Sequence, residues 1–230
     1  MKFFSFLFLL FSFALFSQKN SNTQNLYKKF DSIVNLKNTS LPYGKVFTEK
    51  YRTQENNHQY FDVNQFVIGE VSYQNQAFFD VKIKYDINED DLIVTVDTDF
   101  ENYSIILEKA FVEKFKINTK TFINTNEFGY LEILFDSNEI SFFKKNTKSK
   151  QKKEDKSFVY FKFSEKNQYY LNYKEVYYKI TRKKDIHEIL PNQKNNISSF
   201  YKLNKELMKN DIDKFYQLLS KTIVNNLKSN

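Results

Sequence analysis

The sequence predicts an α+β protein that is mainly antiparallel β-sheet and ends in a C-terminal helical hairpin. Three observations support this fold class. Apolar and polar residues alternate with period two from Phe66 onward, as in strands that bury one face. The period becomes helical at Lys183. The chain also carries 26 Phe and 16 Tyr, which are enough large side chains for a sizeable core.

Residues 1–17 have the pattern of a cleavable secretory signal peptide. Lys2 supplies a positive charge, and residues 3–16 form an apolar run that only two serines interrupt. This run is shorter than the roughly 20 residues of a membrane-spanning helix. We expect cleavage near Ser17 and a mature chain that starts at Gln18 in the periplasm or outside the cell. An uncleaved anchor and a buried N-terminal strand are the alternatives.

Residues 18–64 are expected to form an N-terminal segment of mixed character. Apolar residues at helical spacing predict a short helix over Gln24–Leu36. The stretch Asn38–Asn64 is polar and irregular, and Pro42 and Gly44 mark a turn.

Residues 65–182 are expected to form one antiparallel β-domain. The clearest alternation predicts a strand whose buried face consists of Phe79, Val81, Ile83, Tyr85 and Ile87. The wet face of this strand would consist of Asp80, Lys82, Lys84 and Asp86. Tight turns follow, and Asn75 is a residue type that tolerates a positive φ. The full pattern gives roughly nine to eleven short strands, which favours a meandering barrel, a sandwich or a bent sheet.

Residues 183–230 are expected to form the C-terminal helical segment. A short helix stops at Pro191, and two amphipathic helices follow, the second with Asp211 as its N-cap. The apolar stripe of this αα-hairpin must be buried. We expect it to pack on the β-domain of the same chain, and a partner protein is the alternative.

The counts of cysteine, glycine and histidine exclude several classes of enzyme. Without cysteine there is no disulfide, thiol nucleophile, cysteine-bound zinc or lipid anchor. The three glycines lie too far apart for a P-loop, a dinucleotide-binding loop or a nucleophile elbow. His58 and His187 do not form an H-E-x-x-H motif. We therefore expect no cofactor, no metal and no catalytic residue of a familiar type.

The net charge of +7 could indicate nucleic-acid binding. However, most lysines are interleaved with acidic residues, and the abundance of Lys and Asn is typical of an AT-rich genome. We therefore expect no nucleic-acid partner and no membrane segment after removal of the signal.

Two acidic stretches could bear chemistry. Asp97, Asp99 and Glu101 alternate in a predicted loop and could offer oxygen ligands to calcium. The stretch lacks the glycine and the distal glutamate of an EF-hand, so we interpret it as a solvated acidic turn. The span Glu89–Asp91 is interpreted in the same way. A glycosidase would need two carboxylates in one cleft, and the sequence selects no pair.

The densest cluster of charge is a lysine run that Glu154 and Asp155 alone oppose. Its members are Lys144, Lys145, Lys148, Lys150, Lys152, Lys153 and Lys156. We interpret the run as a long exposed hairpin tip between two strands. The alternative is a patch for anionic lipid headgroups, acidic polysaccharide or an acidic partner. The run lacks the interleaved aromatics that stack on bases.

Tyrosines crowd two adjacent predicted strands after the lysine run. Alternation sends Tyr169 and Tyr173 to one face and Tyr170 to the other. Ordinary sheet packing accounts for them, and an exposed row that stacks on sugar or peptide is the alternative. The candidate surface-interaction residues are therefore Lys144, Lys145, Lys148, Lys150, Lys152, Lys153, Tyr169 and Tyr173.

Three stretches carry a resemblance to known proteins. They are the end of the signal at 15–18, FVIGEVSYQNQAFFDVKIKYDINEDDLIV at 66–94 and KKDIHEILPNQKNNISSFYKLNKELMKNDIDKFYQLLSKTI at 183–223. In these the chain resembles a group of exported, signal-bearing, β-rich proteins of Bacteroidetes. The resemblance implies a β-domain with a C-terminal helical segment in a Gram-negative envelope. It implies no activity and no functional residue.

The sequence thus favours an exported, non-enzymatic envelope protein that acts as a binding or interaction module. Its partner would be a protein or a small ligand of the envelope. The alternatives are a carboxylate-dependent hydrolase without a familiar motif and a docking component of an outer-membrane assembly.

Overall fold

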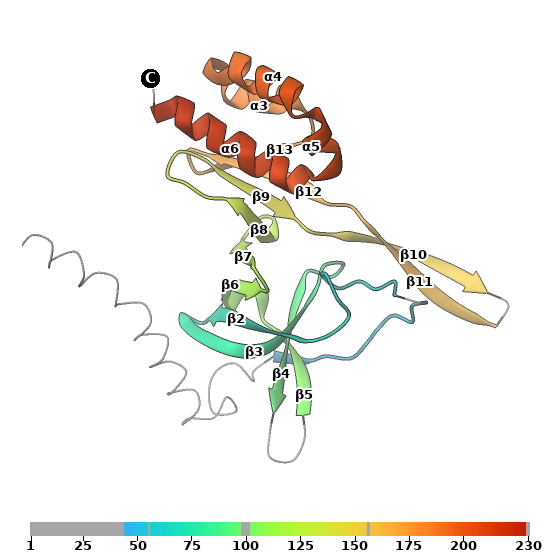
Figure 1. Cartoon of the computed structure of the whole chain (residues 1–230). Coiled ribbons are helices and arrows are strands. Elements are labelled where there is room, and N and C mark those ends of the chain that lie inside the picture. The colour runs from blue at the N-terminus through green and yellow to red at the C-terminus, as the bar shows by residue number, and fades with distance from the viewer. Residues whose placement is uncertain (1–43, 55, 98–101, 156, 229–230) are drawn as a thin grey trace, which may run out of the picture.

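The computed structural model describes residues 44–54, 56–97, 102–155 and 157–228 (Figure 1). The predicted signal peptide, the predicted helix Gln24–Leu36 and the acidic residues Asp99 and Glu101 lie outside these residues. No helix of the described residues combines the length and the apolar content that a bilayer crossing requires.

Most of the described chain forms one antiparallel sheet with the strand order β1-β5-β4-β3-β2-β6-β7-β8-β9-β12-β13. The strands are β1 Gly44–Val46, β2 Val67–Tyr73, β3 Gln76–Asp86, β4 Asp91–Asp97, β5 Asn102–Leu107, β6 Val112–Ile117, β7 Lys120–Thr125, β8 Gly129–Phe135, β9 Ser141–Lys145, β12 Gln168–Tyr173 and β13 Val176–Ile180. The sheet stays open, with β1 and β13 at its edges, and it is strongly bent (Figure 1). This arrangement confirms the mainly antiparallel α+β fold and selects the bent sheet.

Helices cover one side of the β8–β9–β12–β13 half of the sheet (Figure 1). They are α3 Lys183–Ile189, α4 Lys194–Leu203, α5 Lys205–Asn210 and α6 Ile212–Lys228, with a short 3-10 turn at Pro191–Gln193. Another 3-10 turn, Lys109–Phe111, links β5 to β6 in the other half. The apolar stripe of α6 contributes Phe215, Leu219 and Ile223 to a core shared with the sheet. The predicted packing of the helices on the β-domain is therefore confirmed.

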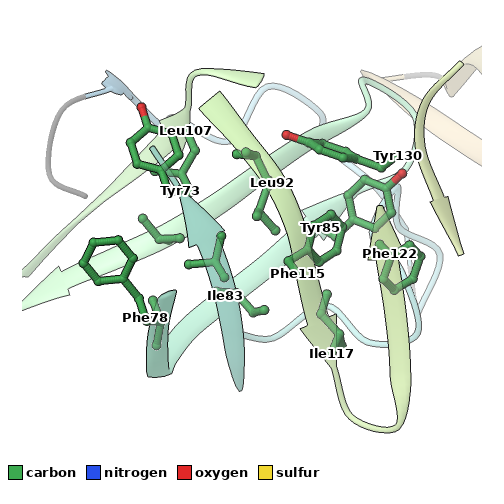
Figure 2. Close-up of a cluster of buried hydrophobic side chains, with 14 of the residues drawn as sticks. Tyr73, Phe78, Ile83, Tyr85, Leu92, Leu107, Phe115, Ile117, Phe122 and Tyr130 are labelled. Carbon is green, nitrogen blue, oxygen red and sulfur yellow. The ribbon is translucent and has the colours of Figure 1, made fainter. Parts of the chain in front are cut away.

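The other half of the sheet wraps around its own core of aromatic and aliphatic side chains. The Tyr85 ring lies 5.2 Å from that of Phe115 and 5.3 Å from that of Phe122, both edge to face. The ring of Tyr130 completes this group 5.7 Å from Tyr85. Figure 2 shows these four rings gathered at one end of the cluster, with Phe78 at the other. A bent sheet can thus bury its concave face without a covering helix.

A β-bulge shifts the predicted alternation of β3. The pairing of β2 with β3 jumps between Gly69 and Val71, and Asp80 adopts φ 57° at the jump. As a result Phe78 is fully buried, whereas Phe79 is only half-buried. The prediction that Phe79 joins the buried face was wrong, because period two does not persist through a bulge.

The predicted wet face of β3 is also partly covered. Lys84 and Asp86 are buried, and the Lys84 Nζ lies 3.6 Å from the centroid of the Tyr60 ring. Tyr60 also forms an isolated β-bridge with Asp86. The segment before β2 therefore packs on this end of β3, a long-range contact that the alternation in β3 does not reveal.

Candidate functional site

The lysine run divides between two strands with different roles. Lys144 and Lys145 end β9, whereas Lys148, Lys150, Lys152 and Lys153 lie on strand β10, Lys148–Asp155. This strand pairs with β11, Phe158–Glu165, in a hairpin that projects from the body of the protein (Figure 1). The predicted long exposed hairpin is thus present as β10 and β11, but the described lysines lie along its first strand and at the end of β9, and Lys156 lies outside the described residues.

Lys144 joins the sheet to the helical layer. Its Nζ lies 2.7 Å from the Asp213 carboxylate on α6, and the Tyr169 hydroxyl donates a hydrogen bond of 2.7 Å to the same carboxylate. Tyr169 is buried there, and Tyr173 packs half-buried against the same core. These three residues of the candidate set therefore serve the contact between sheet and helices.

Lys145 belongs to an ion cluster around Asp90. The Asp90 carboxylate lies 2.6 Å from Lys145 Nζ and 2.9 Å from Lys109 Nζ, and the Tyr85 hydroxyl donates to it at 2.7 Å. Burial lowers the pKa of Lys145, and the Asp90 charge opposes that effect. Gly129 makes room, because at its φ of +66° a Cβ would lie 2.0 Å from Asp90 Oδ2. The cluster ties the β3–β4 turn to β8 and β9.

One edge of the β10–β11 hairpin is covered by a preceding segment. The backbone N–H of Phe161 donates to the Arg52 carbonyl at 2.8 Å. The Asn57 side chain accepts from the Phe163 N–H at 2.6 Å and donates to the Phe163 carbonyl at 2.8 Å. These contacts occupy the outward N–H of Phe161 and both outward backbone groups of Phe163 on β11.

Within the described residues, the opposite edge of the hairpin has no paired strand. In an antiparallel pair, directly opposite residues direct their N–H and C=O groups either toward each other or both away. Phe161 and Phe163 direct theirs away, so their partners Lys152 and Lys150 also direct theirs outward. No strand of the described residues pairs with this side of β10. We call it the free edge of β10.

Lysine side chains flank the free edge. Lys148 is anchored, because its Nζ donates to the carbonyls of His58 and Tyr60 at 2.8 and 2.9 Å. Lys150 donates to the Tyr51 hydroxyl at 2.6 Å, and this hydrogen bond raises the pKa of Lys150. Its Nζ also lies 3.6 Å from the Glu89 carboxylate, a pair that an incoming acidic residue would compete with. Among the described acidic residues, Lys152 pairs only with Glu154, with 2.8 Å between Nζ and Oε1. Both side chains are exposed to solvent.

Lys150 and Lys152 share one face of the hairpin with their partners Phe163 and Phe161, since opposite residues of a ladder point the same way. Lys153 lies on the other face, opposite Tyr160. The free edge thus offers outward backbone groups and two lysines on one face, at alternate positions of one strand.

A buried and a half-buried carboxylate, Asp86 and Asp91, are the closest approach to an acid–base pair among the described residues. Asp86 and Asp91 are direct cross-strand partners, and burial raises the pKa of Asp86 to about 6. The cavity beside them has a volume of about 10 Å³, which is room for one water and for no substrate. Asp86 Oδ1 accepts the N–H groups of Asn88 and Glu89 at 2.9 and 3.0 Å. This geometry fits a role in holding the turn.

A serine–histidine contact joins α3 and α4. Ser198 Oγ lies 3.3 Å from His187 Nε2. No carboxylate of the described residues hydrogen-bonds this imidazole, and Ser198 lies within a helix whose ladder uses the adjacent N–H groups. The contact therefore lacks the oxyanion donors that acyl transfer needs. Within the same residues, no cluster of three or more His, Asp or Glu has the geometry to hold a metal ion.

Comparisons with known proteins give no relative: no family model, no curated protein and no solved structure matches the chain. The resemblance to exported proteins of Bacteroidetes therefore stays a prediction.

Sequence reasoning found the lysines of the site but missed the strand that carries them. Lys148, Lys150 and Lys152 occur at period two, which is the signal that could have indicated a strand. The covering of the other edge by Arg52 and Asn57 has no signal in the sequence, since these residues lie about a hundred positions away from β11.

Proposed function

We propose that this protein is an exported interaction module that binds an acidic, extended segment of a partner protein along the free edge of β10. The observation that carries the proposal is the pair of outward-facing backbone positions at Lys150 and Lys152. An added strand gains affinity from ladder hydrogen bonds and specificity from its side chains.

The lysines determine which strand is accepted. Side chains directly across an antiparallel ladder have Cβ atoms about 4.5–5.5 Å apart. Acidic residues at alternate positions of an incoming strand would therefore lie opposite Lys150 and Lys152. A second copy of β10 in the register that pairs Lys150 with Lys152 would place like charges together, which is destabilising.

Lysines on an edge strand also protect a sheet from aggregation. That protection and the proposed function are compatible, because the lysines repel a basic strand and attract an acidic one. The projection of the hairpin from the body leaves room for an added strand (Figure 1).

The test uses an eight-residue peptide in which Glu alternates with Val, and a second peptide with Lys in place of Glu. Binding of each is followed by NMR on the folded protein. The Glu peptide should bind and should slow hydrogen exchange at the Lys150 and Lys152 amides. The Lys peptide should not bind. Binding that leaves these two amides unprotected would overturn the proposed mode.

A charge-reversal pair supplies the matched control. Lys150→Glu with Lys152→Glu should weaken binding of the Glu peptide by at least about tenfold, the equivalent of 1.4 kcal/mol. Lys114→Glu with Lys116→Glu has the same spacing on β6, but both edges of β6 are paired. This control should bind as the unaltered protein does. If both double variants weakened binding equally, the effect would come from the change in net charge rather than from the position of the lysines. That outcome would contradict the proposal.

A backbone variant separates the ladder from the charge. Lys152→Pro removes the outward N–H together with the lysine, whereas Lys152→Gln removes only the charge. We expect Lys152→Pro to bind the Glu peptide more weakly than Lys152→Gln does. Equal affinities, with both variants folded by circular dichroism, would exclude strand addition at this position.

The export part of the proposal rests on residues 1–17. We expect the protein in the envelope or the medium, with its N-terminus near Gln18 by mass spectrometry. Unprocessed protein in the cytoplasm would contradict it.

A further inference from the structure

The outer side of the helical layer contains a groove of about 850 Å³ between α4, α5, α6 and the segment that enters α3. Its apolar floor consists of Tyr201, Met208, Ile212 and Tyr216. Met208 and Ile212 expose 36% and 37% of their surface, whereas Phe215, Leu219 and Ile223 of α6 are buried. We call this concavity the helical groove.

The rim of the helical groove is strongly basic. It consists of Arg182, Lys183, Lys202, Lys205 and Lys209, and Glu206 is the acidic residue among the lining side chains. Arg182 is paired with Asp185 at 3.1 Å. Within the described residues the four lysines of the rim form no ion pair, unlike Lys144 and Lys145 in the sheet.

From this arrangement we infer that the helical groove binds a small anionic amphiphile, an alkyl chain with a carboxylate or phosphate head. The apolar floor would take the chain, and the lysines of the rim would take the head. The volume lies within the roughly 300–1,000 Å³ of small-molecule pockets. Met208 is unbranched and flexible, which suits it to an alkyl ligand. This site is separate from the free edge of β10 and does not depend on it.

The lysines come from three helices, which favours one compact head over an extended strand. Lys183 begins α3, Lys202 ends α4, and Lys205 and Lys209 lie on α5. Among the described residues none of the four lies at ion-pair distance from a carboxylate, so a bound head would gain ion pairs without breaking any.

The test measures binding of dodecanoate and dodecyl phosphate, both below their micelle concentrations, by calorimetry on the folded protein. Both should bind with one site per chain, and a neutral amphiphile of the same chain length should bind at least about tenfold more weakly. Vesicles of phosphatidylglycerol form a third arm. Binding to vesicles without binding to the monomeric probes would show a membrane surface site and overturn the inference.

Two variants locate the site. Lys205→Glu with Lys209→Glu should lower the affinity for both probes by at least about tenfold. Met208→Glu should have the same effect, because it places a charge in the apolar floor that would contact the alkyl chain. Lys221→Glu, on an exposed position of α6 outside the groove, is the matched control and should bind normally. Circular dichroism and the thermal midpoint establish that each variant is folded. Unchanged affinity in the folded double variant would overturn the inference.

Discussion

Two lysine–carboxylate pairs in this protein have nearly the same length and very different surroundings. Lys145 lies 2.6 Å from Asp90, with 14% and 18% of the two side chains exposed. Lys152 lies 2.8 Å from Glu154, with 59% and 68% exposed. Both lysines come from one run of the sequence. Burial, rather than distance, therefore distinguishes an ion pair that stabilises the fold from one whose charges can still bind a partner.

The two pairs differ in the free energy that is lost when one partner is removed. Removing one partner of a buried pair leaves an uncompensated charge in a poorly solvated place. An exposed pair contributes roughly 0–1 kcal/mol, because water replaces either partner. The dense charge of residues 144–153 therefore has two parts. Lys144, Lys145 and Lys148 are bound within the fold, whereas Lys152 of β10 is exposed.

The largest effect should come from matched amide substitutions in the two pairs. Asp90→Asn keeps the size of the side chain and its tolerance of positive φ, but it leaves Lys145 and Lys109 without their anion. We expect a loss of about 2–4 kcal/mol in the free energy of unfolding, measured by urea denaturation. Glu154→Gln should lose less than about 0.5 kcal/mol. Equal losses of unfolding free energy in the two variants would contradict the conclusion that burial determines what each ion pair contributes.

The next effect concerns the glycine that admits the Asp90 carboxylate. Gly129→Ala should lose about 2–3 kcal/mol, because the new Cβ meets Asp90 Oδ2 at a backbone φ of +66°. Asn75→Ala, at φ 62° in an exposed turn, is the control for the conformational part and should lose about 1 kcal/mol. In a double-mutant cycle, Gly129→Ala and Asp90→Asn should be less than additive. Full additivity would show that the glycine and the ion cluster are independent.

Asp86 sharpens the comparison, because it is a buried carboxylate with no lysine at ion-pair distance among the described residues. Burial raises its pKa from 3.8 to about 6, so the folded state holds the proton more tightly than the unfolded state. The stability that this group contributes is therefore present below about pH 4 and is lost as pH rises through about 6.

Asp86→Asn mimics the protonated form and keeps an acceptor oxygen for the turn. We expect its unfolding free energy to match that of the unaltered protein near pH 4, and to exceed it by about 2–3 kcal/mol near pH 7.5. Urea midpoints at both pH values measure this. A variant that is less stable at the higher pH would show that the charged form is the favoured one.

The smallest effect should come from the free edge itself. Lys152→Gln should change the unfolding free energy by less than about 0.5 kcal/mol, while binding of the acidic peptide probe weakens. A loss of more than about 1 kcal/mol in the unfolding free energy would show that Lys152 stabilises the fold as Lys144 and Lys145 do. It would contradict the distinction between structural and exposed lysines in the run.

Local patterns in the sequence predicted the elements of the fold well. Alternation located most strands of the sheet, and helical spacing located the C-terminal layer. The turn at Asn75 has the expected positive φ, at 62°. The pattern failed at Phe79, where a bulge exchanges the two faces, and at Lys84 and Asp86, which a distant segment covers. The first failure is local, because period two does not persist through a bulge. The second depends on a separate segment around Tyr60 that packs on β3.

The sequence by itself determined the antiparallel meander, the change to helices near Lys183 and the residues from which a site could be built, because these follow from periodicity and side-chain type. The tertiary structure alone decided which of those residues are accessible. It buried Lys145 beside Asp90 and gave one edge of the hairpin to the segment around Asn57. It left the other edge free beside Lys150 and Lys152. Accessibility depends on contacts between segments far apart in the chain, and no local pattern records such contacts.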